Sequence, residues 1–438
     1  LSLLAALHLF AWFPAFASSP PAPAGRFALL LTVEGGIGPG VAEYVRDGLD
    51  RAAEQGAAVV VIRLDTPGGL DAATRRIVQA MLASPVPVAV WVAPRGARAA
   101  SAGLFILSAA QVAAMAPGTA TGAATPVNLG GGGGDENSDL RKKVVNDAAA
   151  YLRGLADYHG RNQDWVEQAV RKAASVPAEE ALRLGVVDML ASDLPGLLAG
   201  MDGRRVRLPS GPVVLDTDGL SVLRFEPGWR HQLLAAISDP NIAFILLMVG
   251  VYGLLVEFAA PGFDVGGVVG GIALILGLFA LNMLPVHATG LALMGLGAAL
   301  LIAEMFIASF GVLGFGGLAA LVLGAAVAFD FDVPGFSLSP VVVATVAALG
   351  GLLLLATLRS VWRTRGRPAM TGGQGMIGAN GRVLNWSGHT GTVLAHGERW
   401  AATAPTTLAP GQTVRVLARR GLQLEVTAVP DEDGGHVR

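Results

Sequence analysis

A serine, two adjacent glycines and a lysine are the residues of this sequence whose types and spacing could support acyl transfer. Ser101 lies in the run RAASAGLFIL, between a predicted strand over 86–92 and a predicted helix over 102–110. Its hydroxyl would sit at a helix N-terminus, where unpaired N–H groups and the helix dipole favour negative charge. Ser101 could therefore be a nucleophile or an ordinary helix N-cap, and its own ten residues favour the cap.

A glycine turn is the second feature. DTPGG (65–69) directly follows a continuous apolar strand over 58–64. Proline fixes the chain, and Gly68 and Gly69 let the backbone turn so that its N–H groups face outward. Such donors at the end of a strand can hold a developing oxyanion, although most Pro-Gly-Gly segments are only turns.

A serine nucleophile also needs a group that takes its proton. His159 is the only histidine between the N-terminal segment and residue 203, and its place in DYHGRN favours a contact at a helix end. A Ser-His-Asp arrangement is therefore poorly supported. The chain has three lysines, Lys142, Lys143 and Lys172, and a lysine buried against apolar walls can lose its charge and act as a base.

Lys143 opens a predicted helix over 138–158. Val144, Ala148 and Tyr151 could form an inward stripe on that helix. The alternative is a solvated lysine that pairs with Asp147 one turn later, and the residues alone favour it.

The elements that must position these residues alternate between short apolar runs and amphipathic segments. The predicted strands cover 27–33, 58–64, 86–92 and 111–116, and the predicted helices cover 41–55, 71–83, 102–110, 138–158 and 164–174. This alternation predicts a layered α/β domain over 24–200 with right-handed crossovers.

Composition indicates a membrane protein with soluble parts. The chain is 53% hydrophobic and only 15% charged, and its mean hydropathy is +0.55. The net charge of −2 gives no argument for nucleic acid as a partner. The absence of cysteine excludes disulfides, thiolate nucleophiles and cysteine-based metal sites, and no metal site or cofactor is expected.

The membrane part is predicted over 241–360. Five apolar blocks, each near the ~20 residues that cross a bilayer, lie at about 242–259, 267–285, 289–306, 311–329 and 340–358. Because the loops near 286 and 309 are short, four spans with a re-entrant piece are the alternative. Glu257 and Glu304 lie in or near these blocks, and a structural role is favoured over a functional one for both.

The flanking segments indicate the orientation. Residues 1–17 end in Ala15-Phe16-Ala17 and predict a signal peptide, with an uncleaved anchor as the alternative; either would export the next domain. The arginine-rich segment 359–367 follows the last block and places the chain beyond 358 in the cytoplasm. Residues 201–240 are predicted to be a connector, with weak strands around Val206 and Val213. Short strands over 369–430 predict a small closed barrel of OB type, with a sandwich hairpin as the lesser option.

Several motifs in one order carry a resemblance to a known family. They are DTPGG, RAASAG, MAPGTATGAATPV (115–127), KVVNDAAAYLRGLADYHGRN (143–162), EEALRLGVVDML (179–190), YGLLVEFAAPGF (252–263), AEMFIASFGVLGFGG (303–317) and GMIGANGRVL followed by GTVLAHGERWAA. Together they resemble the ClpP/crotonase superfamily, and specifically the membrane-bound long-form NfeD proteins, which resemble signal peptide peptidase. The resemblance covers essentially the whole chain.

The resemblance implies a multidomain protein: an α/β ClpP/crotonase-like serine protease domain, about five transmembrane helices and an OB-like barrel. It implies Ser101 as the nucleophile and Lys143 as the general base in K-x-x-N, with Asn146 as the asparagine. The oxyanion positions would be Gly68, Gly69 and the Ala102 N–H.

The implied activity is a membrane-anchored serine endopeptidase with a Ser-Lys dyad, acting in membrane protein quality control. Its substrates would be apolar peptide segments, including those of stomatin-like membrane partners. A homo-oligomer (a dimer or larger) in the cell membrane is expected, with the protease domain outside the cytoplasm and the barrel inside.

Two other functions stay open. One is a non-catalytic membrane scaffold that partners a stomatin- or flotillin-like protein. The other, a crotonase-type acyl-CoA enzyme, is disfavoured because an exported domain meets no CoA. The glycine-rich loop NLGGGGGDENSDL before Lys143 is expected to be either mobile, ordering with substrate, or a tolerated surface insertion.

Overall fold

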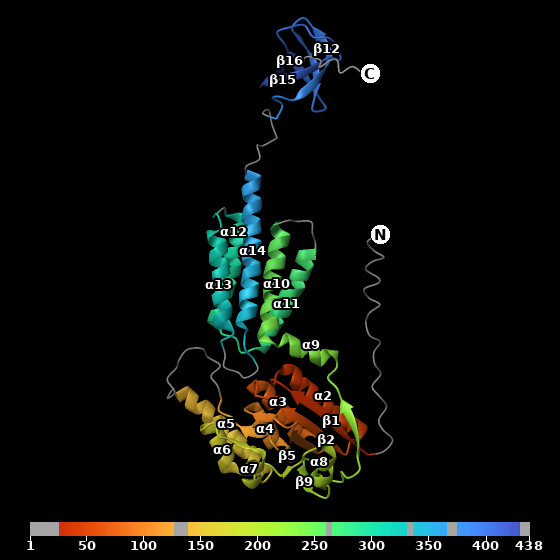
Figure 1. The fold of residues 1–438 in the computed structure, drawn as a ribbon, viewed down its shortest axis with the longest axis vertical. Coiled ribbons are helices and arrows are strands. Elements are labelled where there is room, and N and C mark those ends of the chain that lie inside the picture. The colour runs from red at the N-terminus through yellow and green to blue at the C-terminus, as the bar shows by residue number, and fades with distance from the viewer. Residues whose placement is uncertain are drawn as a thin grey trace, which may run out of the picture. The chain divides into compact units, whose positions relative to one another are not determined.

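The computed structural model describes residues 26–126, 139–259, 265–307, 309–330, 336–365 and 375–429, in two compact units with a boundary at Leu354–Leu355 (Figure 1). The predicted signal peptide and most of the glycine-rich loop lie outside the described residues. The predicted layout of an α/β domain, apolar helices and a C-terminal barrel is confirmed.

The N-terminal domain is built on a parallel sheet with the strand order β11-β1-β2-β3-β5-β8. Its strands are β1 (Phe27–Glu34), β2 (Val59–Asp65), β3 (Val88–Val92), β5 (Val112–Met115), β8 (Met189–Leu190) and β11 (Ser221–Phe225). Its helices are α2 (Pro39–Gln55), α3 (Asp71–Ala83), α4 (Ala102–Ala109), α5 (Asp139–Tyr158), α6 (Gln163–Arg171), α7 (Ala178–Arg183) and α8 (Leu194–Met201). The strands and helices predicted up to residue 174 are therefore confirmed, with ends that shift by at most three residues.

Alternate side chains of each strand enter separate cores, because successive side chains point to opposite faces. Leu29 and Leu31 pack in the core formed with α2, α3 and α4, whereas Ala28 and Leu30 pack in the core formed with α8. Both faces of the sheet are thus covered, which explains the unbroken apolar runs of the strands.

Two parts of this domain differ from the prediction. A small sheet of β4 (Arg98–Ala100), β6 (Ala120–Gly122) and β7 (Ser175–Pro177) was not predicted, because three residues are too few to show a period. The predicted connector over 201–240 holds the hairpin β9 (Arg205–Leu208) and β10 (Gly211–Val214), strand β11 and helix α9 (Trp229–Ile237). Since β11 pairs with β1, part of that connector belongs to the main sheet.

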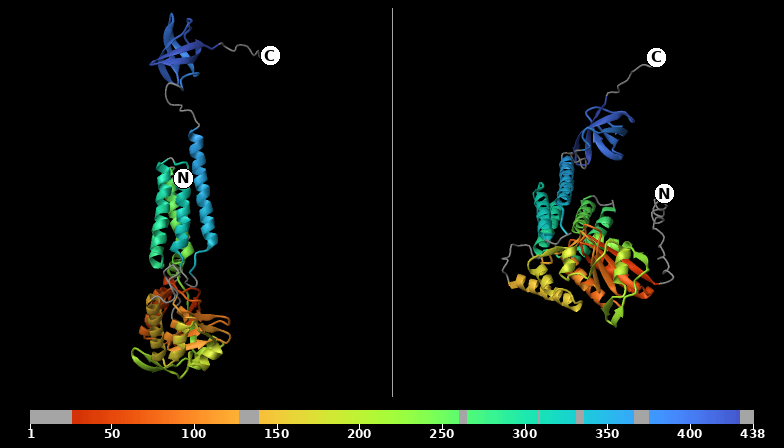
Figure 2. Two further views of the ribbon diagram at one scale, coloured as in Figure 1. Left: turned by 90° about the vertical axis from the view of Figure 1, so that its left-hand side faces the viewer. Right: turned by 60° about the horizontal axis from the view of Figure 1, so that its bottom comes forward.

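Five helices make up the membrane part: α10 (Pro240–Ala259), α11 (Val265–Met283), α12 (Ala288–Phe306), α13 (Val312–Ala328) and α14 (Pro340–Arg365). Figure 2 shows α10–α13 running side by side. Within the described ranges, four of the five are long and apolar enough to cross a membrane, and α13 is a shorter apolar helix of 17 residues. The predicted count of about five spans thus corresponds to four full-length helices and one shorter one.

The hairpins α10–α11 and α12–α13 repeat one another at a distance of 47 residues. In the first, Glu257 accepts a hydrogen bond from the N–H of Gly267, and in the second Glu304 accepts one from the N–H of Gly314, ten positions later in both cases. The closest glycine contacts also correspond: Gly250 with Leu274 and Gly277 with Leu247 in the first hairpin, Gly297 with Leu321 and Gly324 with Met294 in the second. Both glutamates hold a neighbouring helix N-terminus, which agrees with the structural role favoured for them.

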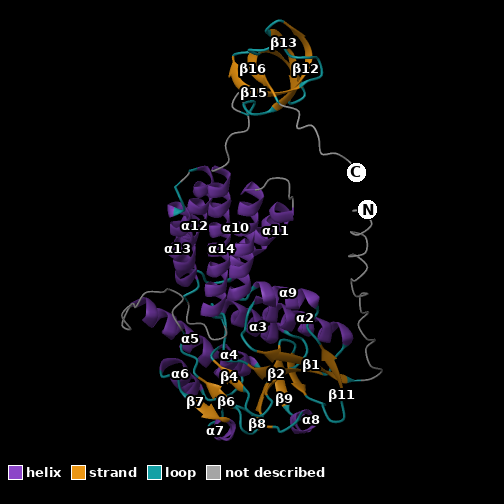
Figure 3. Cartoon of the chain, turned by 45° about the horizontal axis from the view of Figure 1, so that its top comes forward, coloured by secondary structure: helices purple, strands orange, loops and turns teal. Residues whose placement is uncertain are grey.

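The C-terminal unit contains a closed five-stranded barrel in the order β12-β13-β14-β16-β15 (Figure 3). Its strands are β12 (Asn380–Ser387), β13 (Thr390–Ala395), β14 (Glu398–Thr403), β15 (Thr413–Arg420) and β16 (Gln423–Ala428). The predicted OB-like barrel is therefore confirmed in place of the sandwich hairpin.

Candidate active site

Ser101 joins strand β4 to helix α4 in a backbone conformation that L-residues rarely adopt. Its φ is 52° and its ψ is −114°, and its N–H donates to the Gly122 carbonyl at 2.9 Å. Such a conformation costs on the order of 1–3 kcal/mol and persists only where the surroundings impose it. Ser101 is the N-cap residue by position, but its side chain makes no capping hydrogen bond. The alternative prediction that its hydroxyl caps α4 is therefore wrong.

The turn at Gly68 lies directly against this serine. Gly68 has a φ of +133°, and a Cβ on it would stand 2.8 Å from the Ser101 Cβ. Its N–H donates to the Thr66 hydroxyl at 3.1 Å, so this N–H already has a partner. Thr66, directly after β2, therefore orients the turn. Its role was not predicted, although a threonine two residues before the glycine could have indicated it.

Gly69 is braced from behind by Ile37. The Ile37 N–H donates to the Gly68 carbonyl at 2.8 Å, and the Leu70 N–H donates to the Ile37 carbonyl at 2.9 Å. A Cβ on Gly69 would stand 2.3 Å from the Ile37 oxygen, so only glycine fits here. Among the described residues, the N–H groups of Gly69 and Ala102 have no hydrogen-bond partner.

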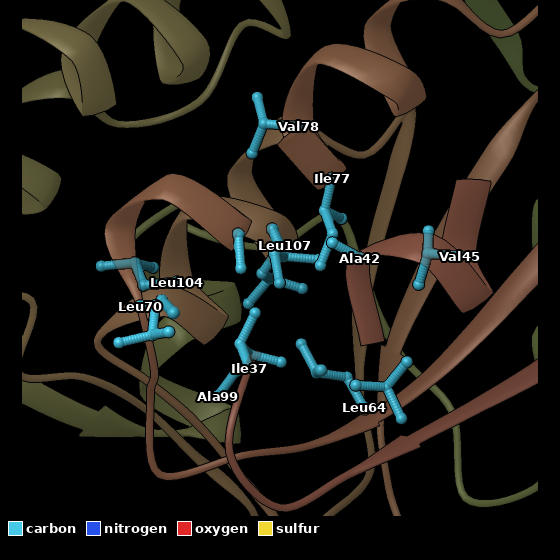
Figure 4. Close-up of a cluster of buried hydrophobic side chains, with 14 of the residues drawn as sticks. Ile37, Ala42, Val45, Leu64, Leu70, Ile77, Val78, Ala99, Leu104 and Leu107 are labelled. Carbon is cyan, nitrogen blue, oxygen red and sulfur yellow. The ribbon is translucent and has the colours of Figure 1, made fainter. Parts of the chain in front are cut away.

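The small residues around Ser101 are closely packed against neighbouring elements. Ala99 and Ala102 are buried, and Ala99 lies in the apolar core with Ile37 and Leu104 (Figure 4). A Cβ on Gly103 would stand 2.7 Å from the Thr66 methyl group. These residues let β2, β4 and α4 approach one another closely, and that approach holds Ser101 beside the turn.

Lys143 lies on the second turn of α5 and makes no hydrogen bond with Ser101. Its side chain is exposed, and neither Lys143 nor the Ser101 hydroxyl makes a hydrogen bond or ion pair with any described residue. Val144 is 45% exposed, so the buried stripe of α5 begins only at Ala148. The inward stripe predicted to start at Val144 is wrong at that residue.

The remainder of α5 is held to the domain by aromatic and ionic contacts. Arg75 of α3 binds Asp147 at 2.7 Å and lies over the Tyr151 ring, with its guanidinium 4.8 Å from the ring centroid. Tyr151 in turn stacks on Phe105 of α4 at 5.9 Å. Asp147 thus pairs with Arg75 and not with Lys143, so the pairing predicted as the alternative for Lys143 does not occur. Lys142 faces Asp139 at 4.0 Å.

His159 and Arg161 hold the other end of α4. His159 bonds to the backbone of Ala109, and its Nε2 is buried without a partner among the described residues. Burial, with the positive charge of Arg161 second, lowers the pKa of His159 from 6.5 to about 4. The predicted helix-end contact exists, but it is made to α4 and not to the helix that carries His159.

Arg161 is a buried cation that the sequence reasoning missed. It pairs with Asp188 at 2.7 Å and donates to the Leu107, Ser108 and Ala110 carbonyls. These are the last carbonyls of α4, which a cation stabilises. The helix that begins at Ser101 is therefore fixed at both ends.

The geometry assembles three parts of an acyl-transfer site: a serine hydroxyl without a partner, an adjacent turn and two free N–H groups. No group of three or more histidine, cysteine or acidic residues that could hold a metal ion occurs in the described ranges. No described residue is hydrogen-bonded to the Ser101 hydroxyl, so these contacts identify no group that would take its proton.

Three family models match the chain. The NfeD1b N-terminal domain matches residues 28–191, the NfeD integral membrane domain matches 241–359, and the NfeD-like C-terminal, partner-binding domain matches 373–427.

Relatives match over most of the chain. It is 32% identical over 408 residues to membrane-bound protease PH1510 of Pyrococcus horikoshii, which covers 90% of this chain and 92% of that protein. It is 26% identical over 306 residues to membrane protein NfeD1b of Bacillus subtilis, which covers 67% of this chain and 65% of that protein.

Solved structures of the 1510-N membrane protease, which is specific for a stomatin homolog from Pyrococcus horikoshii, are similar to the N-terminal half. A serine-to-alanine mutant has a TM-score of 0.44 and 32% identity over 47% of this chain and 100% of that chain. A lysine-to-alanine mutant in complex with a substrate peptide has a TM-score of 0.45 and 31% identity over 48% of this chain and 97% of that chain.

Proposed function

Since the chain belongs to the NfeD family of membrane proteins, we propose that its N-terminal domain is a serine endopeptidase anchored in the membrane by α10–α14. Ser101 is the nucleophile and Lys143 is the general base. The similarity to a membrane-bound protease over 92% of that protein's length supports the reaction class.

The observation that carries this proposal is the strained position of Ser101. The chain holds a serine at a φ of 52° between a strand and a helix, with its hydroxyl unpaired and against a glycine turn. A capping serine would need none of this strain. Strain of this kind clusters at functional sites, because the fold then presents the reacting group in one fixed direction.

In the proposed reaction, the Ser101 oxygen attacks the carbonyl carbon of the scissile peptide while the Lys143 amine takes the hydroxyl proton. The tetrahedral intermediate collapses as its C–N bond breaks and the lysine passes the proton to the leaving amine. Water then attacks the acyl-enzyme, the lysine takes the water proton, and the acyl–oxygen bond breaks to return the proton to Ser101.

We assign the oxyanion to the N–H groups of Gly69 and Ala102. Both are free of other partners among the described residues, whereas the N–H of Gly68 donates to Thr66. Gly68 would have to break that bond before it could act as a donor. Its role is instead to let the turn pass against Ser101, where a Cβ would collide.

For Lys143 to act, the first two turns of α5 must close over Ser101. Leu140 is 72% exposed and Val144 is 45% exposed, so this part of α5 presents apolar side chains to solvent. An apolar substrate segment would cover them and remove water from the lysine, which favours its uncharged form. The proposed substrates are therefore apolar segments, including those of a stomatin-like partner recognised by the C-terminal domain.

We place the N-terminal domain outside the cytoplasm and the barrel inside it. Four arginines and no acidic residue occur over 359–367, at the end of α14 and directly after it, as expected on the cytoplasmic side. An odd number of crossings is needed, and the repeat of the two hairpins supports it, since α13 has the same contacts to α12 as α11 has to α10. At about 26 Å, α13 approaches the ~30 Å of a hydrocarbon core.

The test is cleavage of an apolar peptide by the full chain in membranes, and labelling of Ser101 by a serine-directed phosphonate. Ser101→Ala and Lys143→Ala should each lower cleavage by about 1,000-fold or more, since triad and dyad members act as a unit. Lys142→Ala is the matched control and should retain activity within about twofold, because its neighbour carries the base. Wild-type rates in Ser101→Ala, or loss in Lys142→Ala with retention in Lys143→Ala, would contradict the assignment.

A non-catalytic scaffold is the second candidate, and one observation favours it: Lys143 is exposed and makes no hydrogen bond with Ser101. In that case the partner-binding domain would carry the function. The same variants separate the two functions, because a scaffold would bind its partner equally well with Ser101→Ala and would show no cleavage in the wild type.

A further inference from the structure

Helix α9 carries an exposed apolar stripe at the junction between the N-terminal domain and the membrane helices. Trp229 is 69% exposed and Leu233 is 48% exposed, whereas Ile237 is buried. These three residues are four apart, so they lie along one face of the helix. The stripe thus runs from an exposed tryptophan into the packed base of the membrane bundle.

The opposite face of α9 is fixed to α2. His231 bonds to Asp47 at 2.9 Å and meets the Tyr44 ring edge-on, with the ring centroids 5.7 Å apart. One turn later, Ala235 packs so closely on Gly40 that a Cβ there would stand 2.6 Å from the Ala235 nitrogen. Because His231 and Ala235 alternate with Trp229 and Leu233 at half a turn, the exposed stripe points away from the domain.

The level of α9 along the membrane normal follows from its contacts with helix ends. Ser238 directly follows α9 and contacts Met283, the last residue of α11. Asn241, in the first turn of α10, binds the backbone of Ser337 and Ser339, which lead into α14. The start of α10, the end of α11 and the start of α14 therefore meet beside α9. Figure 1 shows α9 next to the ends of α10 and α11. Because these helices are long and apolar enough to cross a membrane, their ends define the level at which they would leave the hydrocarbon.

We infer that α9 is an interfacial helix whose Trp229–Leu233 stripe lies in the headgroup and upper acyl region of the bilayer. Tryptophan is enriched at this level because its ring has an apolar body and a polar N–H. The exposed guanidinium of Arg230, beside the stripe, suits the lipid phosphates. Helix α9 thus seats the N-terminal domain on the membrane through α2, in addition to tethering it through α10.

The absence of cysteine from the chain makes a direct test possible. The full chain with Leu233→Cys carries a nitroxide spin label in vesicles of phosphatidylcholine with a minor fraction of phosphatidylglycerol. The collision rate of the label is measured with oxygen, which partitions into the bilayer, and with a nickel chelate, which stays in water. The matched control is Leu182→Cys on α7, an apolar residue that is 39% exposed on the same domain.

The oxygen-to-nickel ratio at 233 should exceed the ratio at 182 severalfold, and a label at Trp229→Cys should behave like the one at 233. Equal ratios at the three positions would overturn the inference, because the stripe would then face water. A label shielded from both collision partners would also overturn it, since a second copy or another protein would then cover the stripe. The two test positions keep the result decisive if one variant fails to insert.

Discussion

Ser101 has a positive φ, a backbone conformation that glycine adopts with less strain than serine. The surrounding structure imposes this φ through the Ser101 N–H bond to Gly122 on one side and the Gly68 turn on the other. Stability therefore favours glycine at position 101, whereas the proposed reaction needs the serine hydroxyl. The difference in stability can be measured.

Ser101→Gly should be more stable than Ser101→Ala by about 1–2 kcal/mol, because glycine adopts positive φ without a Cβ penalty. Both variants should lose cleavage. Urea unfolding of the two variants side by side gives the difference, and the shared loss of the hydroxyl cancels in the comparison. Equal stabilities would show that the backbone at this position is not strained.

His159 makes the domain sensitive to acid. Its pKa in the folded protein, about 4, lies below the ordinary 6.5, so between these values the unfolded chain binds the proton more readily. The stability contributed by the neutral ring is complete above pH 6.5 and is lost as the pH falls toward 4, by up to about 3 kcal/mol.

His159→Gln should therefore flatten the pH dependence, since glutamine can still donate to the α4 end but does not titrate. Thermal unfolding of both proteins, measured from neutral pH down to the lower pKa, checks this. A parent protein that loses no more stability than His159→Gln on acidification would contradict the burial of a neutral ring.

At the scale of elements, α5 is a helix with an anchored half and an exposed half. The anchor is Arg75, which binds Asp147 and covers the Tyr151 ring. Since Arg75 and Asp147 are 37% and 67% exposed, their ion pair adds little to stability. We expect the ion pair instead to position the first turns of α5, which carry Lys143.

Arg75→Gln should lower kcat for peptide cleavage by about tenfold while changing the free energy of unfolding by less than about 1 kcal/mol. The matched control is Arg153→Gln, which breaks the exposed pair with Glu167 further along α5. Steady-state kinetics and urea unfolding on the same preparations separate the two effects. An unchanged kcat in Arg75→Gln would mean that the anchor does not position Lys143.

The helices and long strands were predictable because each buries one face or both, and burial leaves a period in the sequence. The strands β4, β6 and β7 were not, since three residues show no period. Strand β11 was missed because its partner β1 lies almost 200 residues away. The residues of Ser221–Phe225 give no local indication of that pairing. The serine, the turn and the Ala102 N–H could be placed from adjacent elements, whereas Lys143 could not. The position of Lys143 depends on the contacts of Arg75 with Asp147 and Tyr151, which the sequence does not reveal.

At the scale of the whole molecule, the candidate site lies close to a membrane loop. Phe336, which is buried before α14, packs its ring on Gly38, where a Cβ would stand 2.9 Å away. Gly38 follows Ile37, the residue that braces Gly69. A short chain of contacts therefore joins the last membrane helix to the proposed oxyanion turn.

Phe336→Ala should slow labelling of Ser101 by a serine-directed probe in the full chain, because the loss of the ring frees the segment that braces the turn. About 3 kcal/mol of packing is at stake for a buried phenylalanine. Phe279→Ala is the control, since this ring on α11 is 46% exposed and does not approach the domain's turn. Equal labelling rates in both variants would show that Phe336 does not affect the reactivity of Ser101.

The pairing of β11 with β1 also affects how the chain is made. Strand β1 is synthesised first and pairs with β2 soon afterwards, but its other edge stays open until residues 221–225 arrive. Strand β11 precedes α10 with only helix α9 between them, so the edge of β1 can be covered only shortly before the first membrane helix is made. Exposed edges of this kind recruit other strands. Completion of the sheet thus comes just before synthesis of the membrane helices, and slow pairing of β11 would leave β1 open to mispairing.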